Sequence, residues 1–363
     1  MELLITSEPT TKYRIWCPRT VLITRSARAF VHGRAMAERA RAMGANVVEL
    51  GGDRVTLERN DNARQAYANA KSTLAIVVAP PSKRKLQPIA PSADWRVDLA
   101  QGCPAHCSYC YLAGSLKGPP ITRAYANLEE IFGALPDYLG QGTITSRNTA
   151  RAGEGTTYEA SCYTDPLGIE AVTGSLSKAI SWFGRWDADV QLRFTTKFDD
   201  VGGLLDLDHQ KRTRMRASIN PAAFARFEGG TAPVANRLAA LRQMADVGYP
   251  IGLTIAPIIA ADGWEDVYGE LITQAGEILS GGDCGDLTIE LITHRFTAGS
   301  KETLQNWYPG SALDMTDTNR STKRNKFGGQ KHVYDTATMR TLREFFDTRI
   351  ARDLPNARIL YWT

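Results

Sequence analysis

Short apolar runs alternate with stretches of helical period along most of this chain. From residue 94 onward, six runs rich in β-branched and aromatic residues predict strands at 95–99, 157–161, 190–195, 215–219, 251–256 and 287–292. The stretches between them predict helices at 128–139, 169–183, 233–247 and 264–278. Such an alternation is typical of an α/β fold, and we expect a parallel sheet closed partly into a (β/α)6 barrel.

The two ends of the chain follow different patterns. Residues 1–90 predict a small α/β unit, with a helix at 32–43, a linker at 79–88 and strands at 21–24, 47–50 and 74–78. After residue 296 the chain becomes polar and basic, and Gly328-Gly329 lies between two strand-like runs at 323–327 and 331–334, which predicts a β-hairpin. A helix at 338–350 and a strand at 358–362 are expected to follow. We therefore divide the chain into an N-terminal domain (1–90), a barrel (91–296) and a C-terminal extension (297–363).

Composition places the chain among ordinary globular proteins. It has 363 residues, of which 43% are hydrophobic and 23% charged. No apolar run is long enough to cross a membrane, and the first residues lack the pattern of a secretory signal. Six cysteines are too few and too unevenly spaced for a secreted disulfide framework. We expect a cytoplasmic protein with no membrane partner.

The net charge of +4 does not by itself indicate a polyanionic partner. Two segments, 209–216 and 320–332, nevertheless carry several basic residues and no acidic one. Local clusters of this kind can neutralise phosphates, although a solvated basic surface is the commoner explanation for each.

Three cysteines in a C-x3-C-x2-C pattern are the strongest chemical signal. Cys103, Cys107 and Cys110 lie on one short loop directly after the first predicted barrel strand. Three thiolates can bind three irons of a 4Fe–4S cube and leave the fourth iron open for another ligand. A structural zinc site or inert thiols are the alternatives, but zinc commonly needs four ligands and the chain has no second C-x2-C unit.

A fourth cysteine follows the second barrel strand. Cys162 is therefore expected on the same face as the cysteine loop, where Tyr109 and Tyr111 flank Cys110. Thiol S–H and phenol O–H bonds are weaker than most C–H bonds, so these three residues could relay a hydrogen atom. A lone cysteine after a strand is more often a small buried hydrophobic residue.

The cysteine loop resembles that of the radical S-adenosylmethionine (SAM) superfamily, and further runs resemble the spore photoproduct lyase family. These runs extend in order from about residue 69 to the C-terminal part: Asn69–Leu74, Gly102–Leu112, Glu159–Cys162, Thr196-Lys197, Arg216–Asn220, Ala256–Ile258 with Gly263–Glu265, and His294–Thr297. The resemblance implies a partial radical SAM barrel and an enzyme that reverses the ultraviolet thymine dimer 5-thyminyl-5,6-dihydrothymine.

The resemblance also implies a role for individual residues. Cys103, Cys107 and Cys110 would bind a 4Fe–4S cluster, and Cys162 would donate hydrogen to the repaired thymine. Tyr109 and Tyr111 would return hydrogen toward 5′-deoxyadenosine. The residues implied to contact SAM are Thr164, Lys197, Ser218 and Ala256. The family has serine where this chain has Thr164, and both side chains carry a hydroxyl.

The basic C-terminal segment resembles the hairpin that this family wedges into DNA. Lys326 and Phe327 stand where Arg and Tyr are expected, so the planar fork and a hydroxyl are lost. Arg324 and Lys331 are the neighbouring candidates for DNA contact. Implied partners are ultraviolet-damaged DNA and a low-potential electron donor such as flavodoxin or ferredoxin. The alternatives are a radical SAM enzyme acting on a different lesion or substrate, and a non-catalytic DNA-binding protein with a structural cluster.

Overall fold

An eight-stranded sheet forms the centre of the molecule. The structure is a computed structural model that describes residues 15–363 apart from 58–59, 116–118, 281–285, 319 and 325–328. The strand order is β17-β14-β13-β11-β10-β9-β5-β4, and only the β4–β5 pair is antiparallel. The strands are β4 (Gln87–Ile89), β5 (Ala93–Val97), β9 (Thr156–Ala160), β10 (Val190–Thr196), β11 (Thr213–Ile219), β13 (Ile251–Ile258), β14 (Leu287–Thr293) and β17 (Arg358–Trp362). The six predicted barrel strands therefore lie side by side in the sheet, in the same order as in the chain, which confirms the partial barrel.

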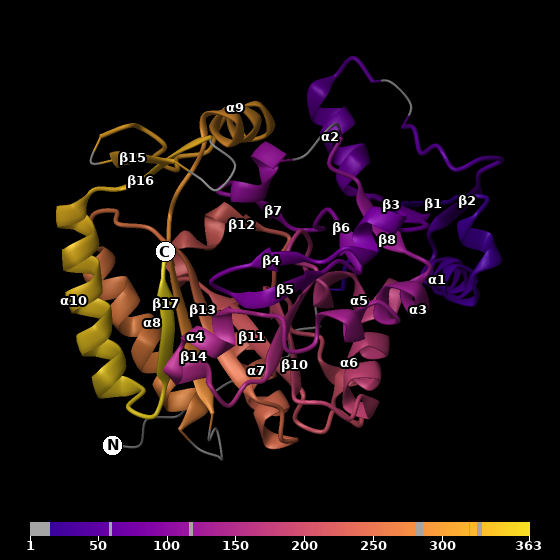
Figure 1. The fold of residues 1–363 in the computed structure, drawn as a ribbon. Helices are drawn as coiled ribbons and strands as arrows, with labels where there is room; N and C mark the ends of the chain where they lie inside the picture. Colours follow the sequence, from indigo (N-terminus) through magenta and orange to yellow (C-terminus); the bar gives the residue numbers. More distant parts are fainter. Residues whose placement is uncertain (1–14, 58–59, 116–118, 281–285, 319, 325–328) are drawn as a thin grey trace, which may run out of the picture.

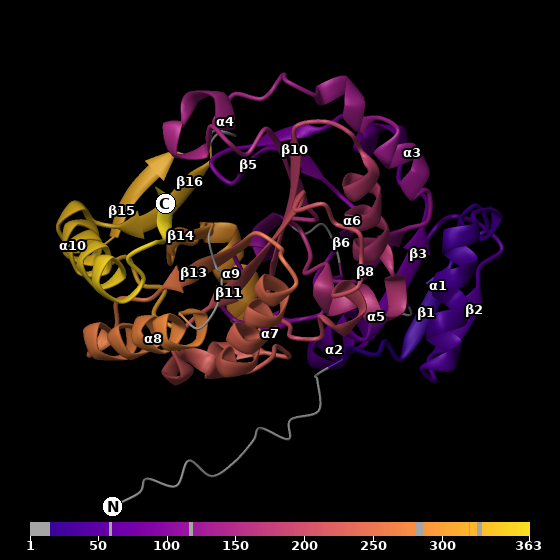
Figure 2. The same ribbon diagram turned by 90° about the horizontal axis from the view of Figure 1, so that it is seen from below.

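Helices cover the outer face of this curled sheet, as Figure 2 shows. They are α6 (Ser175–Arg185), α7 (Val234–Asp246), α8 (Trp264–Leu279) and α10 (Thr336–Asp353). Each turns apolar residues toward the strands; in α7 these are Leu238, Leu241 and Met244, all fully buried. The inner face of the sheet is left for the polar residues described below.

Two predicted helices are shorter than expected. The segment 169–183 is divided into α5 (Glu170–Thr173) and α6, because Gly174 between them has a φ of +60° that ends the first helix. The segment 128–139 forms α3 (Leu128–Phe132) and a separate 3-10 turn (Leu135–Tyr138). Pro136 accounts for this break, since a proline lacks the N–H that a continuing helix would use.

A second, five-stranded sheet lies beside the barrel in the N-terminal part (Figure 1). Its order is β2-β1-β3-β8-β6, and the helices α1 (Val31–Ala42) and α2 (Ala63–Lys71) belong to the same part. Its strands are β1 (Thr20–Ile23), β2 (Asn46–Glu49), β3 (Thr73–Val77), β6 (Ala100–Gln101) and β8 (Thr122–Tyr125). Two strands thus come from beyond residue 90, and the three-domain division remains a proposal.

The predicted linker at 79–88 contributes regular structure instead. It contains a 3-10 turn (Pro81–Arg84) and leads into β4, which pairs with β5 at the edge of the barrel sheet. Proline is tolerated in a strand mainly at a sheet edge, where its missing N–H breaks no ladder bond. Pro88 in β4 therefore fits an edge strand, although the prolines around it suggested a loop.

The C-terminal extension begins with α9 (Ala298–Trp307) and the predicted hairpin, whose strands are β15 (Arg320–Arg324) and β16 (Gln330–Tyr334). The first strand starts three residues earlier than expected. Figure 1 shows the hairpin, α9 and the short strand β7 (His106–Cys107) at the same end of the molecule. Among the described residues, no helix is long and apolar enough to cross a membrane.

Candidate active site

The cysteine loop is fixed by backbone contacts on both sides. Its strand β7 pairs with β12 (Glu228–Gly229), so that Cys107 lies opposite Glu228. Lys71 of α2 donates hydrogen bonds to the carbonyl oxygens of Cys103, at 2.6 Å, and Ala105. Gly102 has a φ of +81°, and a Cβ there would lie 2.3 Å from the carbonyl oxygen of Ile121. These contacts fix the conformation of the loop from both sides.

One cavity of about 430 Å³ collects the residues singled out in the sequence. All ten predicted cluster, SAM and hydrogen-transfer residues line it: Cys103, Cys107, Tyr109, Cys110, Tyr111, Cys162, Thr164, Lys197, Ser218 and Ala256. These positions span more than 150 residues of sequence, and the carboxyl ends of the barrel strands bring them together.

The chemistry of the donor set fits an iron–sulfur cube. Cys103, Cys107 and Cys110 are free thiols that face this cavity, and burial raises the pKa of Cys103 to about 11, against the opposing effect of Lys71. Thiols must lose a proton to bind metal, so loading the site would release protons. Within the described part of the chain, no three metal-ligating side chains converge on a single ion. A cube does not need that convergence, because each thiolate binds a different iron.

A buried carboxylate organises the side of the cavity next to the cysteine loop. Glu228 accepts hydrogen bonds from Lys197 at 2.8 Å, from Arg237 at 2.6 Å and from the hydroxyl of Tyr109. Burial alone would raise the pKa of Glu228, but Lys197 and Arg237 outweigh it and hold this pKa at about 2. The carboxylate is therefore ionised, and it fixes both a predicted SAM contact and a predicted hydrogen carrier.

Cys162 is presented to the cavity by a sharp turn after β9. Ser161 has a φ of +53°, donates its backbone N–H to Val97 at 2.7 Å, and accepts from the N–H of Leu99 at 2.9 Å. Burial raises the pKa of the Cys162 thiol, and the nearby Asp98 raises it further, while Arg96 lowers it. Cys162 is thus a protonated thiol at neutral pH, the form that can give up a hydrogen atom.

The other predicted SAM contacts lie at neighbouring strand ends. The hydroxyl of Thr164 is buried and has no hydrogen-bond partner among the described residues, so it is available to a ligand. Ser218 lies near the end of β11 and is 4% exposed. The carbonyl oxygen of Ala256 accepts from Lys197 at 3.2 Å. Asp165 accepts from the backbone N–H of Lys197 at 2.7 Å and so ties the Thr164 turn to β10.

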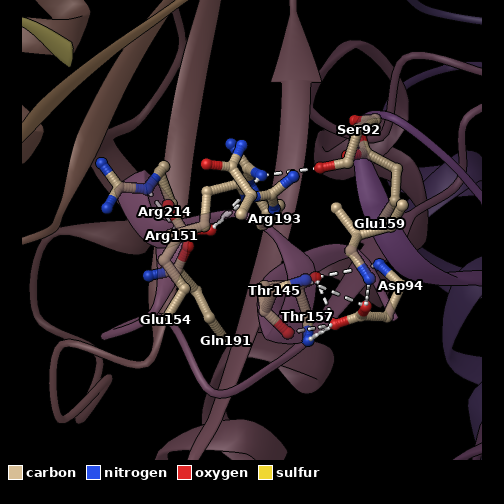
Figure 3. A network of polar contacts seen from close by, with 12 residues as sticks. Ser92, Asp94, Thr145, Arg151, Glu154, Thr157, Glu159, Gln191, Arg193 and Arg214 are labelled. Atoms are coloured by element: carbon tan, nitrogen blue, oxygen red, sulfur yellow. Dashed lines mark hydrogen bonds and ion pairs between the residues drawn. The ribbon is translucent and has the colours of Figure 1, made fainter. Parts of the chain in front are cut away.

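Ion pairs fill the barrel below this cavity. Glu290 on β14 accepts from Arg216 at 2.6 and 2.7 Å and from Arg193 at 3.0 Å, and all three side chains are at most 1% exposed. Arg216 also pairs with Glu159. Figure 3 shows the adjoining part of the network, in which Arg193 lies between Ser92 and Glu154. These ions form the polar floor of the cavity, since Glu159, Arg216 and Glu290 also line it.

Several of these residues were not singled out as functional from the sequence. Glu228 and Lys71 act on residues far away in the chain, and Arg237 binds Glu228 nine residues before it, so none of the three has a signal in its local pattern. Arg193 and Glu290 do have one: each is a charged residue with apolar neighbours on both sides in the middle of a strand. Such a residue is expected to have a buried partner, and this pattern would have found the floor of the site.

The basic hairpin stands beside the same end of the barrel. Arg324 is exposed and Lys331 is half-buried, whereas Lys326 and Phe327 lie outside the described residues. Arg320 is used structurally: it donates to the carbonyl oxygen of His294 at 2.7 Å and lies 3.8 Å from the ring centre of Tyr334. Of the predicted DNA contacts, Arg324 is therefore open to solvent, and the roles of all four remain proposals.

Comparisons with known proteins agree with this geometry. The family model described as spore photoproduct lyase matches residues 16–363. The chain belongs to the spore photoproduct lyase family. Spore photoproduct lyases of a Geobacillus species and of Bacillus subtilis are 37% and 36% identical to it over 348 residues, which cover 95% of this chain and 98% of each relative. The predicted family and the class of radical SAM lyase are confirmed.

Solved structures of the family have the same fold. A spore photoproduct lyase variant, with a cysteine replaced by alanine and with bound dinucleoside spore photoproduct, matches with a TM-score of 0.88 and 36% identity, covering 96% of this chain and all of that one. A related variant with bound S-adenosylmethionine and the same dinucleoside matches with a TM-score of 0.87, also at 36% identity, and covers 95% of this chain and 99% of that one. The likeness extends over the barrel, the N-terminal part and the C-terminal extension.

Proposed function

We propose that this protein repairs spore photoproduct in ultraviolet-damaged DNA, converting 5-thyminyl-5,6-dihydrothymine to two thymines. The observation that carries this proposal is the single cavity lined by three loop cysteines, Cys162, two tyrosines and Lys197. Membership of the lyase family supports the same reaction. A non-catalytic DNA-binding protein would have no use for this combination of residues around one cavity.

We assign the cofactors to two sides of the cavity. Cys103, Cys107 and Cys110 would hold a 4Fe–4S cluster, while Lys197, Ser218, Thr164 and Ala256 would hold SAM at its open iron. When bound, the reduced cluster and SAM would supply the radical chemistry needed to remove a hydrogen atom from C6 of the dihydrothymine. Lys197 is suited to the SAM carboxylate, because its ammonium group already lies at the cavity wall between Glu228 and the carbonyl of Ala256.

Cys162 would complete the repair. Once the methylene bridge between the thymines breaks, the methyl carbon of the freed thymine carries an unpaired electron. The S–H bond of Cys162 breaks and a C–H bond forms, leaving a thiyl radical on sulfur. Tyr111 and Tyr109 would then pass hydrogen to the thiyl and recover it from 5′-deoxyadenosine. The bond from Tyr109 to Glu228 holds this phenol at the cavity wall.

The lesion must leave the helix to reach this cavity, and we assign its delivery to the hairpin. Arg324 and Lys331, together with Lys326 and Phe327, would contact the phosphate backbone and fill the opened step. A reductant such as flavodoxin or ferredoxin would supply the electron. We place the protein in the cytoplasm, because an oxygen-sensitive cluster needs a reducing compartment.

Anaerobic reconstitution with iron, sulfide, SAM and dithionite tests the proposal. We expect the protein to convert synthetic dinucleotide spore photoproduct to thymidylyl-thymidine, measured by chromatography. Cys162→Ala should still cleave SAM but give mainly other thymine products, because the final hydrogen donor is gone. Cys17→Ala is the matched control, since Cys17 is exposed and does not line the cavity.

Two outcomes would contradict the proposal. Clean repair by Cys162→Ala would remove this residue as the donor. Formation of 5′-deoxyadenosine without any attack on the lesion by the unmodified protein would favour a radical SAM enzyme with a different substrate.

A further inference from the structure

A third cation lines the cavity without an acidic partner. Arg295 follows β14, and its guanidinium lies 5.3 Å from the ring centre of Tyr111. Burial lowers the pKa of Arg295, and the neighbours that oppose this effect are the phenols of Tyr111 and Tyr361. In the described part of the chain, no carboxylate lies within ion-pair distance of Arg295. The guanidinium of Arg295 thus contacts an aromatic ring, and no described carboxylate neutralises its positive charge through an ion pair.

The other cations in this cavity differ in that respect. Lys197 pairs with Glu228 at 2.8 Å, and Arg216 pairs with Glu290 at 2.6 Å. Desolvating a charge is costly unless an opposite charge or several hydrogen bonds compensate it. Among the described cations that line the cavity, Arg295 is therefore the one without a carboxylate in an ion pair with it.

The surroundings of Arg295 are also basic. Lys331 on β16 lies directly opposite Lys323 on β15, a like-charge cross-strand pair that is unfavourable on its own. Burial lowers the pKa of Lys331, and repulsion from Arg295 and Lys323 lowers it further. Because Phe296, next to Arg295, forms a β-bridge with His332, next to Lys331, these three cations lie on neighbouring segments between the hairpin and the cavity wall. An anionic ligand along these segments would relieve their repulsion.

We propose that Arg295 binds the phosphodiester that links the two thymidines of the lesion, and that Lys331 and Lys323 bind phosphates toward the hairpin. This inference rests on the proposed function. A guanidinium can donate two parallel hydrogen bonds to two oxygens of one phosphate, and its contact with the Tyr111 ring keeps the Arg295 guanidinium at the cavity wall. The carboxylate of SAM is the other anion that enters the cavity, but Lys197 stands at the cofactor side next to the cysteine loop.

The lesion exists in two forms that isolate this contact. The dinucleotide contains the linking phosphate, and the dinucleoside lacks it. The measurement is the ratio of kcat/KM for the dinucleotide to kcat/KM for the dinucleoside. We expect the unmodified protein to favour the dinucleotide, and Arg295→Gln to reduce this ratio at least about tenfold, since hydrogen bonds to charged groups are lost. Arg295→Lys, which keeps the charge but not the fork, should give an intermediate ratio.

Arg343→Gln is the matched control. Arg343 also lies over an aromatic ring, 5.6 Å from the centre of Trp362, but it is on α10 and does not line the cavity. The ratio of kcat/KM for the dinucleotide to kcat/KM for the dinucleoside should be the same in Arg343→Gln as in the unmodified protein. If Arg295→Gln does not fold, the lysine variant decides: a lowered ratio supports the inference and an unchanged ratio overturns it.

The remaining outcomes are distinguishable from failure of the proposed function. Equal losses on both substrates in Arg295→Gln would mean that Arg295 acts on SAM or on Tyr111, and would overturn the inference. Equal kcat/KM values for both substrates in the unmodified protein would overturn it as well, while leaving the repair activity intact. Repair of neither form would contradict the proposed function itself.

Discussion

Single buried ions determine the interior of the half-barrel. Glu290 is 1% exposed and is shared by Arg193 and Arg216, with further hydrogen bonds from Thr254 at 3.2 Å and Tyr361 at 3.0 Å. The carboxylate neutralises two guanidinium groups that have no access to water. Gly252 leaves room for one of them, since a Cβ there would lie 3.0 Å from Cγ of Arg216. The polar floor is therefore a packed structure in which each charge depends on its neighbours.

Glu290→Gln should destabilise the protein strongly. The substitution keeps the shape of the side chain but leaves two buried arginines without their shared charge, so we expect a loss of about 3 kcal/mol in the free energy of unfolding. Urea denaturation of the purified protein measures it. Glu49→Gln is the control, because Glu49 pairs with Arg28 and Arg41 at the surface and should change stability by less than about 0.5 kcal/mol. Similar losses of unfolding free energy in the two variants would show that the burial of the Glu290 ion pairs does not matter for stability.

At the scale of elements, one histidine joins the N-terminal part to the barrel. His32 on α1 is 2% exposed, and its Nε2 lies 3.0 Å from the hydroxyl of Ser175 at the start of α6. Burial lowers the pKa of His32 to about 4, and Lys178 and Arg39 contribute to the shift. The imidazole is therefore neutral in the folded protein at the pH where it would begin to take up a proton in the unfolded chain.

Acid should weaken this junction. Between about pH 6.5, the ordinary histidine value, and about pH 4, the unfolded chain binds a proton that the folded protein excludes, so stability falls as the pH falls. One such group contributes up to about 1.4 kcal/mol per pH unit. Unfolding free energies measured across this range should depend less steeply on pH in His32→Gln than in the unmodified protein. If the unfolding free energies of His32→Gln and of the unmodified protein changed with pH by the same amount, His32 would not titrate in this way.

For the molecule as a whole, the distribution of charge matters more than its sum. A net charge of +4 gives little general attraction to DNA, so affinity must come from local groups. Lys323 and Arg324 are exposed on β15, which lies at the same end of the molecule as α9 and the short strand β7 (Figure 1). They are suited to contact backbone phosphates without reading sequence.

Replacing both hairpin residues by serine should weaken DNA binding at every sequence. Each lost phosphate contact lowers the slope of log affinity against log salt by roughly 1, so the double variant should lose roughly 2. Fluorescence anisotropy with an undamaged duplex at several salt concentrations measures this slope. A control with Arg242 and Arg185 replaced, which lie on α7 and α6 away from the hairpin, should keep the original slope. An unchanged slope in the hairpin variant would place the DNA elsewhere.

Local pattern alone was sufficient for most barrel strands. Strands such as β10 and β13 are buried runs whose period shows in the sequence, while the cluster-binding role of Cys103, Cys107 and Cys110 stays a prediction from their spacing within one loop. The edge strand β4 was not predicted, because a proline such as Pro88 fits an edge strand as well as a loop. The division of α5 from α6 was not predicted either, because a glycine such as Gly174 ends a helix only where its φ angle is positive.

The sequence by itself determined the six strands at the centre of the barrel sheet and most of the helices between them, because each depends on residues close together in the chain. Only the tertiary structure decided the pairing of Glu228 with Lys197 and Arg237, the sharing of Glu290 by two arginines, and the position of Arg295 over the ring of Tyr111. The physical reason is that a buried charge must be matched by groups near it in space, and the curl of the sheet selects those groups from distant parts of the chain.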